Sequence, residues 1–251
     1  MNRKLALLVP ALGAAILLLT AADNEHATWS YSGETGPLFW GELDPAYVLC
    51  KTGTTQSPID ITGAESKEGS PLEFHYETST MNVINNGHTI QQNYDPGSFV
   101  IYNSKRFNLK QFHFHRKSEH TVEGKHFAME MHLVHVAGDG ELLVVGVLLK
   151  PGPKSEFLSH FWPHLPGKAG VVAKSENVTI DINKALPENS ALYSYKGSLT
   201  TPPGSEGVNW FVFAEPQTIS VGQAIKFYRL YPHNYRPVQP LNDREISIWN
   251  P

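Results

Sequence analysis

Two short segments with alternating histidines constrain the fold of this chain more than any other feature. They are Gln111–His115 and Glu130–His135. Alternate side chains of a β-strand lie on the same face, so His113 and His115 share one face of the first segment. If the two segments pair as neighbouring strands, His132 can join them there. Three neutral histidines that leave a fourth coordination position open form a catalytic zinc site, so the pattern predicts a metal that activates water.

Each segment also carries a polar residue two positions before a histidine. Gln111 precedes His113, and Glu130 precedes His132, in both cases on the same face. Each side chain is placed to accept the imidazole N–H that the metal does not use, which fixes the tautomer and orientation of the ring. The alternative is a set of core histidines that are hydrogen-bonded to buried polar groups.

The remaining histidines fit packing or surface roles better. His135 falls on the face opposite to His132, so we expect it not to bind the same metal. Six others have no comparable metal-site pattern, and they are His75, His120, His126, His160, His164 and His233. His26 lies near the expected mature N-terminus.

The composition indicates one large globular domain. The chain has 251 residues, of which 41% are hydrophobic, and this is enough for a sizeable core. The formal net charge is −4 and no basic run exceeds two residues, which argues against nucleic-acid binding. After Asp23 the sequence contains no linker, internal repeat or low-complexity tract, so we expect a single domain.

Short apolar or alternating runs separated by proline and glycine predict a mainly β fold. Examples are Phe99–Tyr102, Leu142–Leu149, Val178–Ile182 and Trp210–Ala214. Gly138-Asp139-Gly140 lies between two apolar runs and predicts a hairpin turn. Helical patterns are sparse, and we expect helices at 155–164 and 220–231, each beginning after a serine cap.

The first 22 residues have the features of an export signal. Two basic residues precede Leu5–Leu19, an apolar run with the length of a signal h-region and too short to span a bilayer. Thr20–Ala22 offers small residues for cleavage. We therefore predict a signal peptide at 1–22 and a mature domain at 23–251, periplasmic or secreted and no longer attached to the membrane. An uncleaved membrane anchor is the alternative.

Several motifs together connect this chain to a known family. In order they are Trp29-x-Tyr31, Gln56–Ile61, Asn85–His88, Gln111–His115, Ser118–Val122, Glu130–His135, Ser198–Pro203 and Arg236–Leu241. Their order and spacing resemble those of α-class carbonic anhydrases of the bacterial exported type, from about Trp29 to Arg244. The resemblance implies a mainly β domain, mixed α/β by content. Its large, twisted, mostly antiparallel central sheet would carry a few short peripheral helices.

The resemblance also implies an activity, the reversible hydration of carbon dioxide to bicarbonate and a proton. His113, His115 and His132 would hold one zinc ion per chain, and zinc-bound hydroxide would attack carbon dioxide. Thr200 would accept a hydrogen bond from this hydroxide and donate one to Glu119. Because a carboxylate only accepts, this direction aims the hydroxide at the substrate.

Proton removal would need a relay with a pKa near neutral, because direct transfer to bulk water is slow. His88 follows Asn85-Asn86-Gly87 and matches the proton-shuttle histidine of the family. Tyr31, Asn86 and Gln91 would order the intervening waters, although Gln91 stands where an asparagine is common.

The resemblance assigns further residues and ligands. Asn234 would lie behind the zinc ligands. Carbon dioxide is apolar, so its pocket should be apolar; the matching positions are Val134, Val144, Leu199, Val208 and Trp210. Sulfonamide or anion inhibitors are expected at the zinc, with a weak esterase side activity. Relatives of this type often dimerise, so a homodimer is considered.

Two other classes of function fit part of the pattern. A catalytically silent, carbonic-anhydrase-like binding domain usually lacks one of the zinc histidines, and this chain has all three. A cupin-type metal oxygenase or isomerase also uses His-x-His and a later histidine. It typically adds a glutamate ligand, and it would not account for Gln56–Ile61 or Ser198–Pro203.

The single cysteine is a departure from the family pattern. Exported bacterial members commonly pair a cysteine at the position of Cys50 with one just after the Thr-Thr-Pro-Pro motif, where this chain has Gly204. The resemblance therefore does not carry its disulfide into this chain. Either other packing holds the Thr200 loop, or the loop is held less firmly, or Cys50 pairs between subunits.

Overall fold

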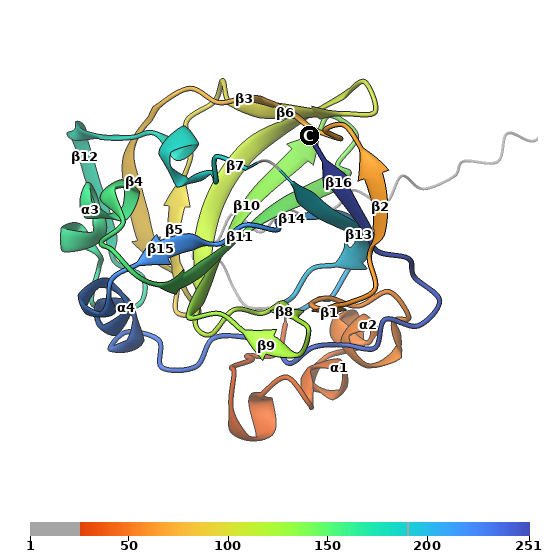
Figure 1. The fold of residues 1–251 in the computed structure, drawn as a ribbon. Coiled ribbons are helices and arrows are strands. Elements are labelled where there is room, and N and C mark those ends of the chain that lie inside the picture. The colour runs from red at the N-terminus through yellow and green to blue at the C-terminus, as the bar shows by residue number, and fades with distance from the viewer. Residues whose placement is uncertain (1–25, 190) are drawn as a thin grey trace, which may run out of the picture.

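The computed structural model describes residues 26–189 and 191–251. The signal peptide expected at 1–22 lies outside them. Most of the described chain is β-strand, arranged as one large sheet with short helices at its margins (Figure 1). This confirms the expected fold class.

The large sheet contains thirteen strands within the described residues. Its main path runs β12-β4-β5-β7-β10-β11-β14-β13-β16-β2, with β6 on β7, β3 on β6, and β15 on β11. Most pairs are antiparallel, whereas β14 and β15 run parallel to β11, and β2 runs parallel to β16. The strands are β2 (Glu65–Glu68), β3 (Glu73–His75), β4 (Ser79–Asn85), β5 (Ile90–Asn93), β6 (Phe99–Tyr102), β7 (Lys105–His115), β10 (Met129–Ala137), β11 (Leu142–Pro151), β12 (Val172–Ile180), β13 (Leu192–Ser198), β14 (Glu206–Phe213), β15 (Gln217–Ile219) and β16 (Ser247–Asn250).

A smaller sheet and two short helices lie at one end of the molecule. The sheet has the order β1 (Asp60–Ile61), β8 (Thr121–Val122), β9 (Lys125–His126). Helices α1 (Trp40–Leu43) and α2 (Leu49–Thr52) lie at the same end (Figure 1). The other helical elements are α3 (Glu156–Ser159), α4 (Val221–Tyr228) and the 3-10 turns η1 (Gly33–Thr35), η2 (Pro45–Tyr47), η3 (Trp162–His164) and η4 (Ile182–Ala185).

The two expected helices have different outcomes. Helix α4 forms with a capping box, in which Ser220 and Gln223 each satisfy the other's backbone N–H. The helix expected at 155–164 is instead broken into α3 and η3. Ser155 does cap α3 through the Leu158 amide, but Pro163 has no N–H with which to continue an α-helix.

Three of the expected strands correspond to β6, β11 and β14. The first has the expected bounds, β11 continues two residues further, and β14 begins four residues earlier and ends one residue earlier than expected. The strand expected at 178–182 lies too far toward the C-terminus. The observed strand β12 ends at Ile180, because the Asp181 side chain caps the turn η4 there. The expected hairpin forms between β10 and β11. It is closed by Gly140 N–H donating to Ala137 O at 3.0 Å.

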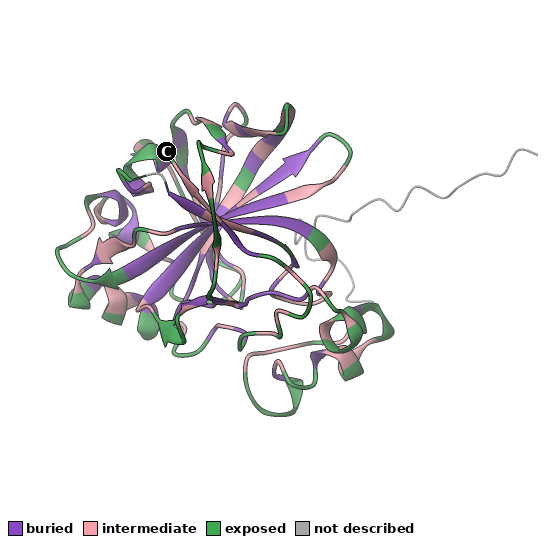
Figure 2. Ribbon diagram, turned by 45° about the vertical axis from the view of Figure 1, so that its right-hand side comes forward, coloured by how far each residue is buried: buried purple, intermediate pink, exposed green. Residues whose placement is uncertain are grey.

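Both faces of the central strands are buried, as the purple strands in Figure 2 show. One face packs a large core that includes Phe112, Phe114 and Leu133. The other packs a smaller apolar cluster around Trp210 and Ile59. The alternation along β7 and β10 thus sends Phe112, Phe114 and Leu133 to the first core, and the other face carries His113, His115 and His132. Among the described residues, no helix is long and apolar enough to cross a membrane.

Candidate metal centre

Strands β7 and β10 pair in the register that the histidine pattern requires. His132 lies directly opposite His113, and Glu130 lies opposite His115. Directly opposite residues of an antiparallel pair share a face. The structure therefore brings His113, His115 and His132 together, with one ligand atom from each within 4.8 Å of the others.

Each of the three rings uses one nitrogen for a hydrogen bond on the side away from the cluster. His113 Nδ1 lies 2.9 Å from Gln111 Oε1, and His115 Nδ1 lies 2.7 Å from the carbonyl oxygen of Asn234. His132 uses its other nitrogen, Nε2, which lies 2.9 Å from Glu130 Oε1. Because these partners are acceptors, each bonded nitrogen carries the proton.

The second nitrogen of each ring is therefore a lone-pair donor. These atoms are Nε2 of His113, Nε2 of His115 and Nδ1 of His132. His115 Nε2 is buried and has no hydrogen-bond partner among the described residues. Burial lowers the pKa of all three rings, that of His115 to about 3, and so favours the neutral form that binds metal. Three neutral imidazole donors in this arrangement fit a zinc ion.

Glu130 is the centre of a fully buried hydrogen-bond network. Besides His132 it accepts from His120 Nδ1 at 2.7 Å and from the backbone amides of Glu119 and His120. His120 Nε2 in turn lies 2.7 Å from the hydroxyl of Tyr195, which lies 2.8 Å from that of Ser57. Burial would raise the pKa of Glu130, but His120 and His132 outweigh it and hold the pKa well below its usual value.

Glu119 lies beneath the cluster, on the chain segment that follows β7. Its side chain is fully buried, and the Arg236 amide donates to Oε1 at 2.7 Å. Its Oε2 has no hydrogen-bond partner among the described residues. Burial raises the pKa of the Glu119 carboxyl, and the Thr200 hydroxyl and the Arg236 amide oppose that rise. Thr200 itself is 5% exposed and so faces the interior with Glu119.

His88 sits on a tight turn between β4 and β5. Gly87 has a φ of 90°, a left-handed conformation that favours glycine. The Asn86 side chain accepts from the amides of His88 and Thr89 at 3.0 and 2.9 Å. The His88 ring stacks on Trp29 at 3.7 Å between centroids, with an 8° angle between the planes. Burial lowers the pKa of His88.

The three polar residues expected to order water lie around this turn and the metal cluster. Asn86 Nδ2 donates to Gln91 Oε1 at 3.4 Å, and Gln91 lies opposite His113 in the β5–β7 pair. Burial raises the pKa of Tyr31 well above its usual value, and the Glu119 and Tyr231 side chains add to the rise. The Tyr31 ring lies 5.4 Å, between centroids, from that of Trp29, on which His88 stacks.

The five expected pocket residues gather in one apolar cluster beside the histidines. Val144, Val208 and Trp210 form part of its buried centre, and Val134 and Leu199 pack against it. The Trp210 ring lies 4.8 Å from that of His132 between centroids. The apolar wall thus adjoins the metal-facing rings.

Cys50 and Gly204 are neighbours in space. A Cβ built on Gly204 would lie 2.7 Å from the Cys50 sulfur. The two segments are already tied by hydrogen bonds. Gln56 Nε2 donates to Gly204 O at 2.9 Å, and Arg236 donates to both Gln56 Oε1 and Cys50 O. These hydrogen bonds connect the same two segments that a disulfide between positions 50 and 204 would join.

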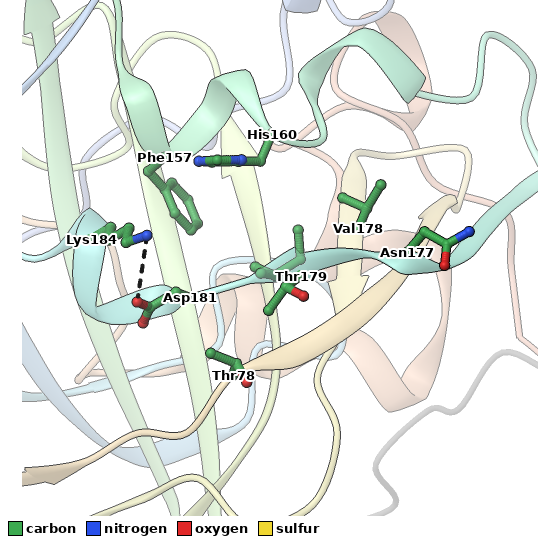
Figure 3. Close-up of a pocket in the computed structure, with 9 residues that line it drawn as sticks. Thr78, Phe157, His160, Asn177, Val178, Thr179, Asp181 and Lys184 are labelled. Atoms are coloured by element: carbon green, nitrogen blue, oxygen red, sulfur yellow. Dashed lines mark ion pairs between the residues drawn. The ribbon is translucent and has the colours of Figure 1, made fainter.

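A cavity of about 390 Å³ lies elsewhere, between β12, α3 and η4. Figure 3 shows its walls, including His160, the segment Asn177–Thr179 and an ion pair between Lys184 and Asp181. It shares no residue with the metal-facing cluster.

Some residues of the site were missed by the sequence interpretation. Trp29, which stacks on His88, was recognised only as part of a motif, and so was Arg236. Tyr195 and Tyr231 gave no signal, because a single tyrosine in a strand or after a helix has no distinctive spacing. His120 was expected to have a packing role, and it is indeed buried and hydrogen-bonded at both nitrogens.

Comparisons with known proteins agree on one family. The family model for eukaryotic-type carbonic anhydrase matches residues 35–249. A protein named carbonic anhydrase from Nostoc is 43% identical over 230 residues, covering 90% of this chain and 87% of its own length. The solved α-carbonic anhydrase of Thermovibrio ammonificans, in complex with sulfanilamide, is 46% identical, with a TM-score of 0.85 and coverage of 88% and 99% of the two chains. A hyperthermostable carbonic anhydrase from a hydrothermal vent chimney is 45% identical, with a TM-score of 0.86 and coverage of 89% and 100%.

Proposed function

The chain belongs to the eukaryotic-type, or α, carbonic anhydrase family and is a carbonic anhydrase, and from this premise we propose how its residues hydrate carbon dioxide. The observation that carries the proposal is the set of three lone-pair nitrogens described above, one of them buried without a partner. We assign His113 Nε2, His115 Nε2 and His132 Nδ1 as the ligands of one zinc ion. Zinc held by three histidines lowers the pKa of a coordinated water to about 7, which makes a hydroxide nucleophile available at neutral pH (carbonic anhydrase is the standard example).

Gln111, Glu130 and Asn234 fix the three rings. Each accepts the N–H that faces away from the metal, so each ring has one tautomer and one orientation. Glu130 adds negative charge behind His132 and makes that ring a stronger donor.

Thr200 and Glu119 orient the nucleophile. Glu119 has a buried oxygen without a partner among the described residues, and the buried Thr200 hydroxyl lowers the pKa of the Glu119 carboxyl. A dication on the histidines would shift the buried carboxyl toward its ionised form, which can only accept. The Thr200 hydroxyl would donate to Glu119 and so be left to accept from a hydroxide held at the metal, an arrangement that would orient this nucleophile toward carbon dioxide. The apolar wall of Val134, Val144, Leu199, Val208 and Trp210 would hold the substrate.

His88 carries the released proton to solvent. Its ring is half-buried, and Asn86 of the same turn donates a hydrogen bond to Gln91, which lies opposite His113. With Tyr31 these polar groups would order a chain of water along which the proton moves.

The mature domain at 23–251 would act after export to the periplasm or the medium. The apolar run and small-residue cleavage site in the first 22 residues support this proposal. Fractionation of cells that express the full chain, with sequencing of the exported N-terminus, tests it. A protein retained in the cytoplasm with Met1 intact would contradict it.

Metal analysis together with a carbon dioxide hydration assay tests the function. We expect one zinc per chain, hydration activity, and inhibition by a sulfonamide such as sulfanilamide, with slow hydrolysis of an activated ester. His113→Ala should remove the zinc and the activity together, whereas the exposed control His160→Ala should keep both. Full zinc loading without hydration would favour the silent binding domain instead.

A further inference from the structure

The position of His88 is set by its backbone turn, because its ring has few contacts. Among the described residues the ring stacks on Trp29 and is in no direct hydrogen bond. A proton relay works only if its ring meets the ordered waters, and a small displacement is costly. Whatever fixes the turn from below therefore influences the relay.

Asn85 is the residue that fixes the turn. Its side-chain nitrogen donates to Pro166 O at 3.0 Å, so its Oδ1 must face the other way, where the Gly87 amide donates to it at 3.2 Å. Its backbone is tied to the 170–171 segment on both sides: Gly170 N–H donates to Asn85 O at 2.8 Å, and Asn85 N–H donates to Val171 O at 3.0 Å. Asn85 is 4% exposed.

The hydroxyl of Tyr231 completes this support. Tyr231 follows helix α4, and its amide donates to Phe227 O at 2.9 Å, which anchors it to the helix end. The Tyr231 hydroxyl donates to Asn85 Oδ1. Because Oδ1 has no proton, the direction of this bond is fixed. Burial raises the pKa of Tyr231 to about 12, so the phenol stays protonated and able to donate.

The same chain segment also reaches the metal ligands. Three residues on, Asn234 donates from Nδ2 to His88 O at 3.2 Å, and its carbonyl oxygen accepts from His115. The support of the relay turn and that of the metal cluster are thus parts of one short stretch, Tyr231–Asn234.

We propose that Tyr231 is a positioning residue for proton transfer, which acts by fixing the Asn85–Gly87 turn and hence the place of the His88 ring. The inference rests on the proposed relay role of His88. Tyr231 is neither one of the assigned metal ligands nor part of the apolar wall, so it should affect only the steps that use His88.

Tyr231→Phe in the zinc-loaded enzyme tests the proposal, because it removes the hydroxyl and keeps the ring. In weak buffer we expect kcat to fall about 3-fold to 10-fold, less than the loss of about 10-fold to 100-fold for His88→Ala. The ratio kcat/KM should stay within about 2-fold, because carbon dioxide hydration at the metal precedes the relay. Added imidazole should restore kcat in both variants. In the His88→Ala background Tyr231→Phe should add nothing.

Tyr94→Phe is the matched control. Tyr94 also has a hydroxyl bonded in the interior, to Glu77 O and Ile180 O, and a pKa raised by burial to about 12. It should leave kcat and its imidazole response unchanged. Asn85→Ala removes the same bond from the other side and serves as the second variant if Tyr231→Phe folds poorly. It should show the same kinetic pattern, a lower kcat in weak buffer with kcat/KM retained.

The outcomes separate the two proposals. If His88→Ala leaves kcat in weak buffer unchanged, the relay assignment is wrong and the role of Tyr231 falls with it. If His88→Ala lowers kcat and Tyr231→Phe does not, only the inference about Tyr231 is overturned. Equal falls in kcat and kcat/KM, or a further fall in the His88→Ala background, would also overturn it.

Discussion

His132 and His135 lie three residues apart on β10 and are both fully buried, yet they belong to different regions of the molecule. His132 faces the metal cluster and uses one nitrogen, bonded to Glu130. His135 faces the large core and uses both, with Tyr76 at 2.9 Å from Nε2 and Leu143 O at 3.3 Å from Nδ1. A buried imidazole with a nitrogen left over can bind a metal, and one with both nitrogens satisfied is structural.

The number of hydrogen-bonded ring nitrogens also distinguishes the other buried and half-buried histidines of the site. His120 uses both nitrogens and is structural. His113 and His115 each use one and join His132. The half-buried His88 uses neither of its ring nitrogens with a described residue, and so its ring remains available to protons and water. The hydrogen-bond partners of each histidine therefore indicate whether it serves as a metal ligand, a structural support or a proton relay.

The largest expected effect comes from Glu130→Gln, which disturbs the hydrogen bonds that hold His132 in place for the metal. The amide cannot accept from both His132 and His120 while two backbone amides also point at it. We expect the dissociation constant for zinc to rise about 10-fold to 100-fold, as for other residues that hold metal ligands. Competition with a chelator measures the dissociation constant, with Glu141→Gln as control, because Glu141 is only partly buried and pairs with Lys105 away from the metal cluster. An unchanged zinc affinity would mean that Glu130 does not support His132.

On the core side, His135→Gln should change how stability depends on pH. Burial lowers the pKa of His135 to about 3, whereas an unfolded histidine titrates near 6.5. As pH falls below about 6.5 the unfolded chain takes up a proton that the folded chain refuses, so His135 destabilises the fold by about 1.4 kcal/mol per pH unit.

His135→Gln removes this contribution. Its free energy of unfolding should therefore fall less steeply between about pH 6 and pH 4 than that of the original chain. Denaturant unfolding with a chelator present keeps zinc release out of the comparison, and the exposed His160→Gln provides the control. Parallel pH curves for the two proteins would show that His135 is not held neutral.

Gly204→Cys tests how firmly the loop that carries Thr200 is held to the Cys50 segment. A disulfide with Cys50 typically stabilises by about 2–4 kcal/mol. Gly204 has a φ of 71°, however, and a side chain there costs about 1–2 kcal/mol. We expect a net gain of roughly 1–2 kcal/mol under oxidising conditions, seen as a higher melting temperature that reductant reverses. With the bond confirmed by mass, an unchanged melting temperature would mean that the hydrogen bonds through Gln56 and Arg236 already hold the loop fully.

The sequence predicted the parts of this site that follow from strand periodicity. His113, His115 and His132 converge because alternation and pairing leave them no other arrangement, and the same rule sends His135 away. Tyr195, Arg236 and Tyr231 could not be found in this way. Their contacts with the site span 75 residues for Tyr195–His120, 117 for Arg236–Glu119 and 146 for Tyr231–Asn85, and no local pattern encodes such pairings. The helix expected at 155–164 was wrong because Pro163 outweighed the Ser155 cap.

The smallest expected effect is on the pH dependence of kcat through His88, whose two ring nitrogens have no hydrogen-bond partner among the described residues. His88 must be neutral to accept a proton during hydration, so kcat in weak buffer should fall as pH drops through the pKa of His88. Burial lowers that pKa, so the inflection should lie on the acid side of 6.5. The ratio kcat/KM should follow the metal-bound water instead, with an inflection near 7. His88→Ala should remove the first inflection and keep the second. A single shared inflection in both profiles, unmoved by His88→Ala, would place the relay on another residue.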